Sequence, residues 1–176
     1  MSLTLQAFAA RVREALLDND TPAGRTQVAS LLADALKDRA FVDSLFDDAA
    51  PERKVVHEDP QLGFCILAHR YTDARDGGPH DHGPSWAIYG QADGETVMSD
   101  WEPVETASPG QRARVRKLRE YKLTPGVAHL YNEGDIHAPS RAGASRLIRI
   151  EGVNLERVRR GVYEPMPATT AAPLRP

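Results

Sequence analysis

Residues 77–90 read Gly77-Gly78-Pro79-His80-Asp81-His82-Gly83-Pro84-Ser85-Trp86-Ala87-Ile88-Tyr89-Gly90. Two histidines stand one residue apart, and an alternating apolar run follows them. Successive side chains of a strand point to opposite faces, so His80 and His82 are expected on one face and Asp81 on the other. Two imidazoles on one face of a rigid sheet can bind one metal ion. The stretch therefore predicts a strand-borne metal site that needs further ligands.

A third histidine follows a glycine-containing turn in residues 132–137, which read Asn132-Glu133-Gly134-Asp135-Ile136-His137. We predict that His80, His82 and His137 together bind one metal ion. The remaining histidines lie in or beside apolar strands without a partner at ligand spacing, which favours packing or surface positions. They are His57, His69 and His129.

Two residues close to the third histidine are candidates for supporting roles. His129 shares a strand face with Val127 and Tyr131, so it is expected to orient a metal ligand through a hydrogen bond. Tyr131 is expected either to supply a phenol near the metal or to pack in the core.

The composition excludes several classes of protein. The chain has 176 residues, 41% hydrophobic residues and a formal net charge of −3, as expected for one globular domain. This charge predicts neither nucleic acid nor a membrane as a partner, and the basic run in residues 112–119 is typical of a solvated face. No apolar run approaches the roughly 18 residues needed to cross a bilayer. The single cysteine, Cys65, is compatible with a reducing cytoplasm, which we expect as the location.

The chain divides into a helical part and a β-rich part. Residues 1–50 contain three apolar stripes at helical spacing, interrupted at residues 18–20 and restarted at Thr21-Pro22, a favoured helix start. We expect this helical extension to pack on a barrel formed by residues 51–165. Short strands separated by turns follow, including an expected hairpin around residues 92–94. The tail, residues 166–176, is rich in Pro, Ala and Thr and is expected to be disordered.

The two histidine segments resemble the two motifs of the cupin superfamily, a glycine followed by His-x-His and a later Pro-x-Gly-x-x-His type of segment. In the second segment, Asn132 stands where the family often has proline. Within that superfamily, Pro79-His80-Asp81-His82 followed by a tryptophan is similar to the thiol dioxygenases related to cysteine dioxygenase. The similarity covers about residues 50–152. It implies a mainly β fold, a cupin double-stranded β-helix (jelly-roll) barrel, here with an N-terminal α-helical extension. Cupins often dimerise, so a homodimer is a candidate assembly.

The departures from the family motifs bear on the chemistry. Many cupins have a glutamate ligand shortly after His-x-His, whereas this chain has Gly83-Pro84-Ser85-Trp86 there, so the site is most simply three neutral histidines. The resemblance implies Fe(II), and the ligand set itself also suits Zn, Mn or Ni. The cysteine that cross-links to a tyrosine in mammalian-type enzymes is absent. Residues 147–151 also lack the family's Ser-x-His-x-Tyr set.

The resemblance suggests one candidate substrate residue, and strand alternation suggests the others. The segment beginning at Arg53 resembles the family segment with a substrate-binding arginine, so Arg53 is expected to bind a substrate carboxylate. Trp86, assigned the histidines' strand face, is expected to wall the pocket. Arg149 and Glu151 are expected to point inward together, where they bind a polar substrate or pair with each other.

Together these features predict a mononuclear non-haem Fe(II) dioxygenase that acts on a small thiol or a similar anionic bidentate substrate with O2. Two alternatives remain open. One is a cupin metalloenzyme of another reaction type, such as a dioxygenase that cleaves carbon–carbon bonds or an isomerase. The other is a non-catalytic cupin that binds or senses a metal.

Overall fold

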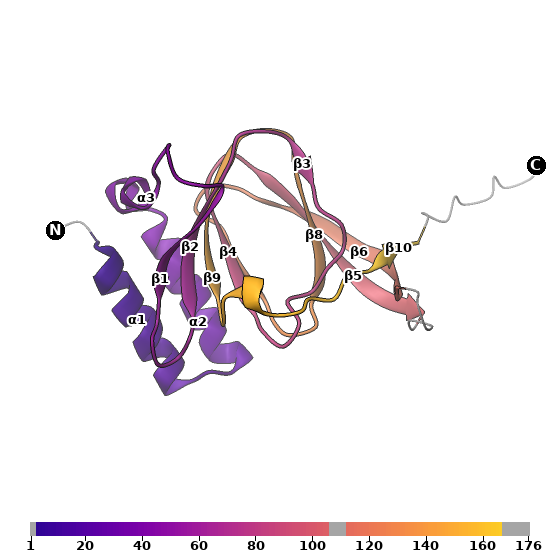
Figure 1. Ribbon diagram of the computed structural model, residues 1–176, viewed down its shortest axis with the longest axis horizontal. Helices are drawn as coiled ribbons and strands as arrows, with labels where there is room; N and C mark the ends of the chain where they lie inside the picture. Colours follow the sequence, from indigo (N-terminus) through magenta and orange to yellow (C-terminus); the bar gives the residue numbers. More distant parts are fainter. Residues whose placement is uncertain (1–2, 106–111, 167–176) are drawn as a thin grey trace, which may run out of the picture.

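The computed structural model describes residues 3–105 and 112–166 and contains three helices followed by two five-stranded sheets (Figure 1). The helices are α1 (Leu5–Asp18), α2 (Pro22–Ala35) and α3 (Arg39–Leu45). Each begins at a residue suited to a helix start. The side chains of Thr4 and Asp38 accept hydrogen bonds from the first turns of α1 and α3, and α2 has proline at its first position.

The strands divide between two sheets of five. The first sheet has the order β1 (Arg53–Glu58), β2 (Cys65–Tyr71), β9 (Ser145–Glu151), β4 (Ala87–Asp93) and β7 (Ala128–Tyr131). The second has the order β10 (Glu164–Pro165), β6 (Arg114–Leu123), β5 (Thr96–Glu105), β8 (Ile136–Arg141) and β3 (Arg75–Asp76). A short 3-10 helix, η1 (Leu155–Arg157), follows β9.

The order of the strands is that of a jelly roll. From β2 to β5, and again from β6 to β9, each successive strand crosses to the other sheet, while β5 and β6 pair with each other. The first sheet therefore contains β2, β9, β4 and β7 side by side, and the second contains β3, β8, β5 and β6. This interleaving is the double Greek key of jelly-roll and cupin barrels. The predicted mainly β fold class with an N-terminal helical extension is confirmed.

The expected hairpin around residues 92–94 is wrong. A tight turn does occur there, with Gly94 at φ +69°, but β4 and β5 enter different sheets and do not pair. A side chain on Gly94 would come within 2.5 Å of the Ala144 carbonyl oxygen, so the crossing also requires a small residue. The alternation pattern identified both strands correctly, and only their partners were misassigned.

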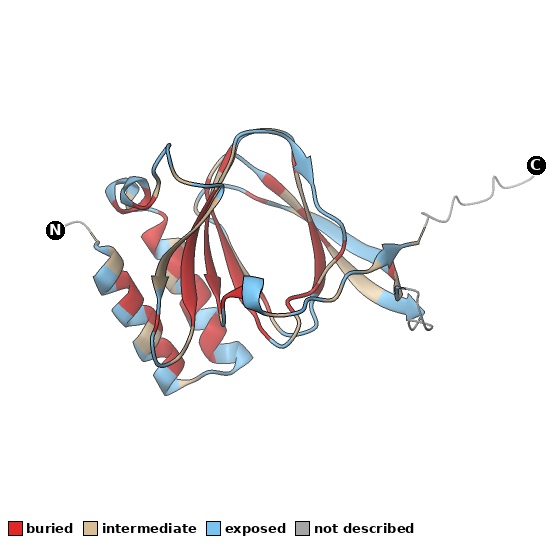
Figure 2. Ribbon diagram, in the orientation of Figure 1, coloured by how far each residue is buried: buried red, intermediate tan, exposed pale blue. Residues whose placement is uncertain are grey.

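The first sheet separates an apolar layer from a polar interior. Its outer face packs against the helices in one large cluster that includes Ile66, Ile88 and Ile150 with Phe8 and Phe41 (Figure 2). Its inner face contributes Tyr89, Tyr131 and Leu147 to a smaller apolar cluster, alongside buried polar residues. The burial on the outer face accounts for the attachment of the helices, and the polar inner face is available for a site.

The helices occupy most of residues 1–50, as the apolar stripes predicted, and cover one face of the first sheet (Figure 1). The expected disordered tail lies outside the described residues, apart from Met166. Among the described residues, no helix is long and apolar enough to span a membrane.

Asp59 connects α1 to the turn between β1 and β2. Its carboxylate accepts hydrogen bonds from Arg13 Nη1 at 2.6 and 2.7 Å and from the N–H groups of Gln61 and Leu62. Burial alone would raise the pKa of Asp59, but the Leu62 N–H, the Arg13 guanidinium and the Gln61 N–H outweigh it and lower the pKa to about 2.

A depressed folded-state pKa means that Asp59 stabilises the fold above about pH 4 and loses this contribution as the pH falls towards 2. We expect Asp59→Asn to lower the free energy of unfolding at pH 7, and the difference from wild type to shrink at pH 3. Urea unfolding of both proteins at the two pH values measures this. A difference that grew as the pH fell would contradict the assignment.

Candidate metal centre

The backbone brings His80 and His137 together across a short antiparallel pairing. Their N–H and C=O groups exchange two hydrogen bonds of 3.0 Å, so the two residues lie directly opposite each other. The chain from β3 onwards runs along β8, first pairing Arg75 with Arg141, and its register shifts by one residue before His80. The residues at this shift, 77–79, read Gly-Gly-Pro, and such bulges re-aim side chains beside functional sites.

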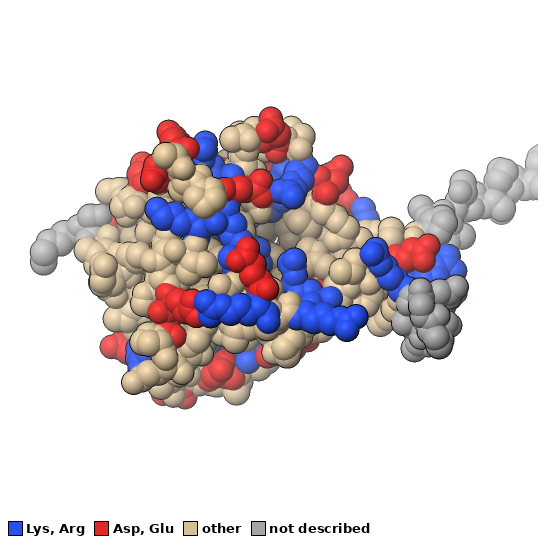
Figure 3. Space-filling model, in the orientation of Figure 1, with Lys and Arg blue, Asp and Glu red and all other residues tan. Residues whose placement is uncertain are grey.

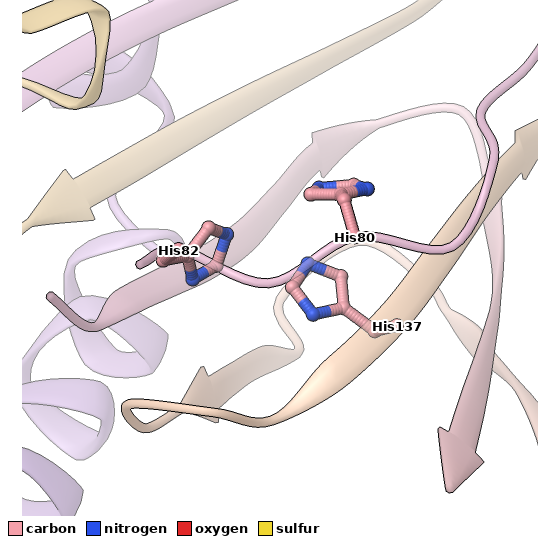
Figure 4. Close-up of side chains that lie close together, drawn as sticks. All are labelled: His80, His82 and His137. Carbon is pink, nitrogen blue, oxygen red and sulfur yellow. The ribbon is translucent and has the colours of Figure 1, made fainter. Parts of the chain in front are cut away.

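The three histidines predicted as ligands form one cluster. Their candidate ligand nitrogens all lie within 4.8 Å of one another, and the ring centroid of His137 is 4.6 Å from that of His80 and 4.7 Å from that of His82. Figure 4 shows the three side chains close together, His80 and His82 on the segment before β4 and His137 on strand β8. His82 and His137 are fully buried, whereas His80 is half-buried at the edge of a cleft.

The hydrogen bonds of the cluster leave lone pairs free. Nδ1 of His80 lies 2.9 Å from the Gly78 carbonyl oxygen, and Nδ1 of His137 lies 3.1 Å from that of Asp135. A carbonyl oxygen can only accept, so each Nδ1 donates its proton and each Nε2 keeps a lone pair. Burial lowers the pKa of all three imidazoles, which are therefore neutral at pH 7, the form that binds a metal.

Tyr89, which the sequence reasoning did not select, closes one side of the cluster. Its hydroxyl oxygen lies 3.0 Å from Nε2 of His82 and 3.4 Å from Nε2 of His137. One phenol proton cannot serve both nitrogens, and Nδ1 of His82 is buried without a partner among the described residues. The hydrogen bonds thus leave ring nitrogens of the cluster unsatisfied, and a cation could bind to the Nε2 lone pairs. The residues present fit a metal ion held by three neutral imidazoles.

Replacing Tyr89 with Phe is expected to destabilise the metal-free protein by about 1–3 kcal/mol, because a buried imidazole nitrogen loses its partner. With zinc bound, that nitrogen has a ligand bond instead, so the stabilisation by zinc should increase by the same amount. Urea unfolding with a chelator and with saturating zinc measures both quantities. Tyr71→Phe, which removes a hydroxyl 3.2 Å from His69 Nδ1, is the matched control. A smaller zinc stabilisation in Tyr89→Phe would contradict this account.

Asp81 points away from the cluster, as strand alternation predicts, and anchors the C-terminal segment. Its carboxylate accepts hydrogen bonds from the N–H of Gly161 at 2.7 Å and from the hydroxyl of Tyr163 at 2.5 Å. This segment lies along residues 79–81, with His80 bridged to Val162. The His-x-His segment is therefore held from both sides, by β8 and by residues 161–163.

The expectation that Trp86 walls the pocket is corrected. Trp86 is buried in the apolar cluster under the helices, with the Arg25 guanidinium 5.4 Å from its ring centroid. The parity count from the histidines failed because the chain is not a continuous strand there. Gly83 has φ +61° and β4 begins only at Ala87, so the alternation restarts and directs Tyr89 to the metal side.

Arg53, predicted to bind the substrate, and Glu151, predicted to act beside it, are paired with each other at the cleft. The Arg53 guanidinium lies 3.0 Å from Glu151 Oε2, 2.8 Å from Asn154 Oδ1 and 2.8 Å from Glu156 Oε2. Its hydrogen-bonding capacity is largely used within the protein, which disfavours Arg53 as the main substrate arginine. Glu151 is fully buried and also accepts from the N–H of Leu155.

Arg149 points inward as expected and is only loosely paired. Its Nη2 lies 3.1 Å from Glu151 Oε1, but the geometry is not that of a hydrogen bond, and Nε and Nη2 of Arg149 have no hydrogen-bond partner among the described residues. The guanidinium carbon lies 4.2 Å from the Tyr89 ring centroid. Arg149 therefore connects the cleft with the phenol beside the histidines.

Tyr131 and His129 line a different cleft from the one that contains Arg53 and Arg149. The Tyr131 ring stacks on His137, with centroids 3.9 Å apart, and its hydroxyl is 2.7 Å from that of Tyr121. His129 lies between the Tyr121 and Tyr131 rings and, among the described residues, has no hydrogen bond to the three histidines. Tyr131 thus supports His137 by packing, and the expected orienting hydrogen bond from His129 is not formed.

A cleft of about 470 Å³ opens beside His80 and Tyr89. The space-filling view shows a hollow on this face, with basic and acidic side chains gathered around it (Figure 3). The cleft also reaches two buried residues that the sequence reasoning did not select as site residues, His69 and Arg141. The signal that could have identified His69 is its alternation with Tyr71 along β2. Arg141 follows His137 by four residues along β8, and only the barrel shows that it faces the cleft.

The fold and the site together define a jelly-roll protein with a three-histidine cluster able to hold a metal ion. No protein-family model and no curated protein matches the chain.

Several solved structures are similar in fold. An uncharacterised conserved protein with a double-stranded β-helix domain from Klebsiella pneumoniae is 13% identical, with a TM-score of 0.47 over 70% of this chain and 88% of that chain. KdgF from Halomonas sp. is 18% identical, with a TM-score of 0.43 over 60% and 82%. A cupin superfamily protein from Desulfitobacterium hafniense is 15% identical, with a TM-score of 0.43 over 63% and 86%. The jelly-roll assignment itself rests on the strand order of this chain.

Proposed function

We propose that this protein is a mononuclear non-haem Fe(II) dioxygenase of the cupin type that oxidises a small anionic thiol. The observation that supports the proposal is a set of three neutral imidazoles, two of them fully buried, beside a cleft lined by arginines. His80, His82 and His137 would hold the ion, and with neutral ligands the ion would keep its full positive charge. When bound, Fe(II) would supply the redox chemistry that adds both atoms of O2 to a thiolate sulfur and gives a sulfinate.

The chain's own residues would bind and orient the substrate. The buried arginines of the cleft, Arg141 and Arg149, attract an anion and hold it beside His80, the histidine at the edge of the cleft. The buried inner face of the first sheet limits the access of water to the reacting sulfur. Burial raises the pKa of the Tyr89 hydroxyl, which therefore stays protonated and can donate a hydrogen bond at the cluster.

The test is oxygen consumption by the protein loaded with Fe(II), with 3-mercaptopropionate, cysteine, cysteamine and a β-diketone as separate substrates. We expect uptake with at least one thiol, and a product heavier than the thiol by two oxygen atoms in mass spectra. His82→Ala should abolish the uptake. If no thiol accelerates oxygen uptake by the iron-loaded protein, the thiol assignment is wrong. Uptake with the diketone alone would indicate a reaction that cleaves a carbon–carbon bond.

A further inference from the structure

Arg141 is a buried cation that lacks an anionic partner. Its side chain is on strand β8 and the residue is 7% exposed. Among the described residues, no carboxylate lies within ion-pair distance of Arg141, and its Nε has no hydrogen-bond partner. Its guanidinium carbon lies 4.1 Å from the ring centroid of Tyr71, on the first sheet, so the side chain reaches across the barrel. Burying an unpaired charge is costly unless a ligand compensates it.

Two further buried side chains with nitrogen atoms that lack hydrogen bonds line the same cleft from the facing sheet. Arg149 is 8% exposed, and its Nε and Nη2 lack hydrogen-bond partners although Nη2 lies 3.1 Å from Glu151 Oε1; His69 is 3% exposed, and its Nε2 lacks a partner. The Arg141 and Arg149 charges both lower the pKa of His69, after the larger effect of burial, so the three groups act on one another electrostatically. Buried donors without partners that converge on a cleft are typical of a site for an oxyanion.

The charge balance of the cleft indicates how much negative charge a ligand should bring. Five arginines and three glutamates line it, a net charge of +2 with neutral histidines. Each glutamate is ion-paired with an arginine: Glu52 with Arg75, Glu156 with Arg53, and Glu151 with both Arg53 and Arg149. An ammonium group would therefore have to compete with an arginine for any carboxylate of the cleft.

From this arrangement we infer that the cleft is built for a small organic dianion without an ammonium group, and that one of its anionic groups binds to Arg141 and Arg149. The inference rests on the proposed function only in placing the reactive end of the ligand at the three histidines. Arg141 is then a specificity-determining residue, and it favours a thiol with carboxylates over an amino-thiol. A planar carboxylate matches the guanidinium groups, whose donors form a fixed fork.

The first experiment needs neither metal nor catalysis. Calorimetric titrations of the metal-free protein at low salt compare succinate, a dianion, with propionate and with β-alanine, which carries an ammonium group. We expect succinate to bind at least about tenfold more tightly than propionate, because a second charge-assisted contact is added, and β-alanine to bind most weakly. Equal affinities for succinate and propionate would overturn the inference whatever the variants do.

Variants then assign the effect to Arg141. Arg141→Gln should remove the preference for succinate, and Arg141→Lys, which keeps the charge but not the fork, should retain part of it. The matched control is Arg75→Gln, since Arg75 lines the same cleft but is exposed and paired with Glu52, and its succinate affinity should stay within about threefold of wild type. Unchanged succinate affinity in Arg141→Gln would contradict the assignment.

The iron-loaded protein separates this inference from the proposed function. With mercaptosuccinate, 3-mercaptopropionate and cysteamine as substrates, we expect oxygen uptake at the lowest KM for mercaptosuccinate, and Arg141→Gln should raise that KM more than it lowers kcat. If succinate binds as expected but no thiol supports oxygen uptake, the anion site stands and the proposed reaction fails. If thiols are oxidised with the same KM irrespective of charge, the reaction stands and the anion site fails.

Discussion

Replacing His137 with Ala is expected to weaken the binding of one divalent metal ion by at least about 100-fold. Loss of a residue that only supports a metal ligand typically costs 10–100-fold in affinity, so loss of a ligand itself should cost more. His137 is fully buried and is central to the cluster, close to both other rings. At a metal concentration about 100 times the wild-type Kd, wild type should gain about 2.7 kcal/mol of stability and the variant almost none.

The measurement is competition with a chelator, together with urea unfolding with and without zinc. His57→Ala is the control, because His57 packs beside Phe64 on the β1–β2 side, outside the three-histidine cluster. The control should bind one metal ion with wild-type affinity. Wild-type affinity in His137→Ala would show that the cluster is not the metal site, whereas loss of binding in both variants would point to a general loss of structure.

Replacing Phe41 with Ala is expected to lower the free energy of unfolding by about 3–5 kcal/mol, the usual cost of emptying a buried phenylalanine site. Phe41 lies on α3, is fully buried and packs against Phe8 of α1 with ring centroids 5.3 Å apart. Both rings belong to the cluster that joins the helices to the outer face of the first sheet. The helices and the barrel should therefore unfold in one transition, at a lower urea midpoint with an unchanged slope.

Leu17→Ala is the matched control for this prediction. Leu17 lies on α1 but is 61% exposed, so its replacement should change stability by no more than about 0.5 kcal/mol. Urea unfolding followed by both circular dichroism and tryptophan fluorescence tests the cooperativity, since Trp86 lies under the helices. Separate transitions for the two signals in Phe41→Ala would mean that the helical layer is an independent unit.

The sequence predicted those features that depend on local patterns. The helical stripes, the short strands and the two histidine segments each leave a periodic or spaced signal within about fifteen residues, and the structure reproduces them. His80 and His137 could be associated in advance because they belong to two motifs with a known relationship. The structure adds the physical reason, a two-hydrogen-bond pairing of the backbone at these residues.

The failures at the site arise because the direction and the partners of a side chain depend on where a strand starts and on what it faces. Trp86 and Tyr89 exchanged roles because Gly83 interrupts the strand, which shifts the alternation. Arg53 looked free because its partners Glu151 and Glu156 are about a hundred residues away along the chain. Alternation along β8 places Arg141 on the face of His137, but only the meeting of the two sheets gives it a place in the cleft.

The interleaved strand order has a consequence for how the protein emerges from the ribosome. The neighbour of β2 in the first sheet is β9, so Leu67 cannot pair with Arg149 until β9 has been synthesised. In the same way, His80 cannot pair with His137 until β8 has been synthesised. The three helices and the β1–β2 pair can form from local contacts soon after synthesis, but the helical face is fully covered only when β9 joins the first sheet. Closing such long loops is entropically costly, so barrel formation should be the slow step of folding. For most of its synthesis the chain therefore exposes the apolar face of its helices and has no complete metal site. A chaperone that covers this face would protect the chain from aggregation at a stage when a metal ion could not.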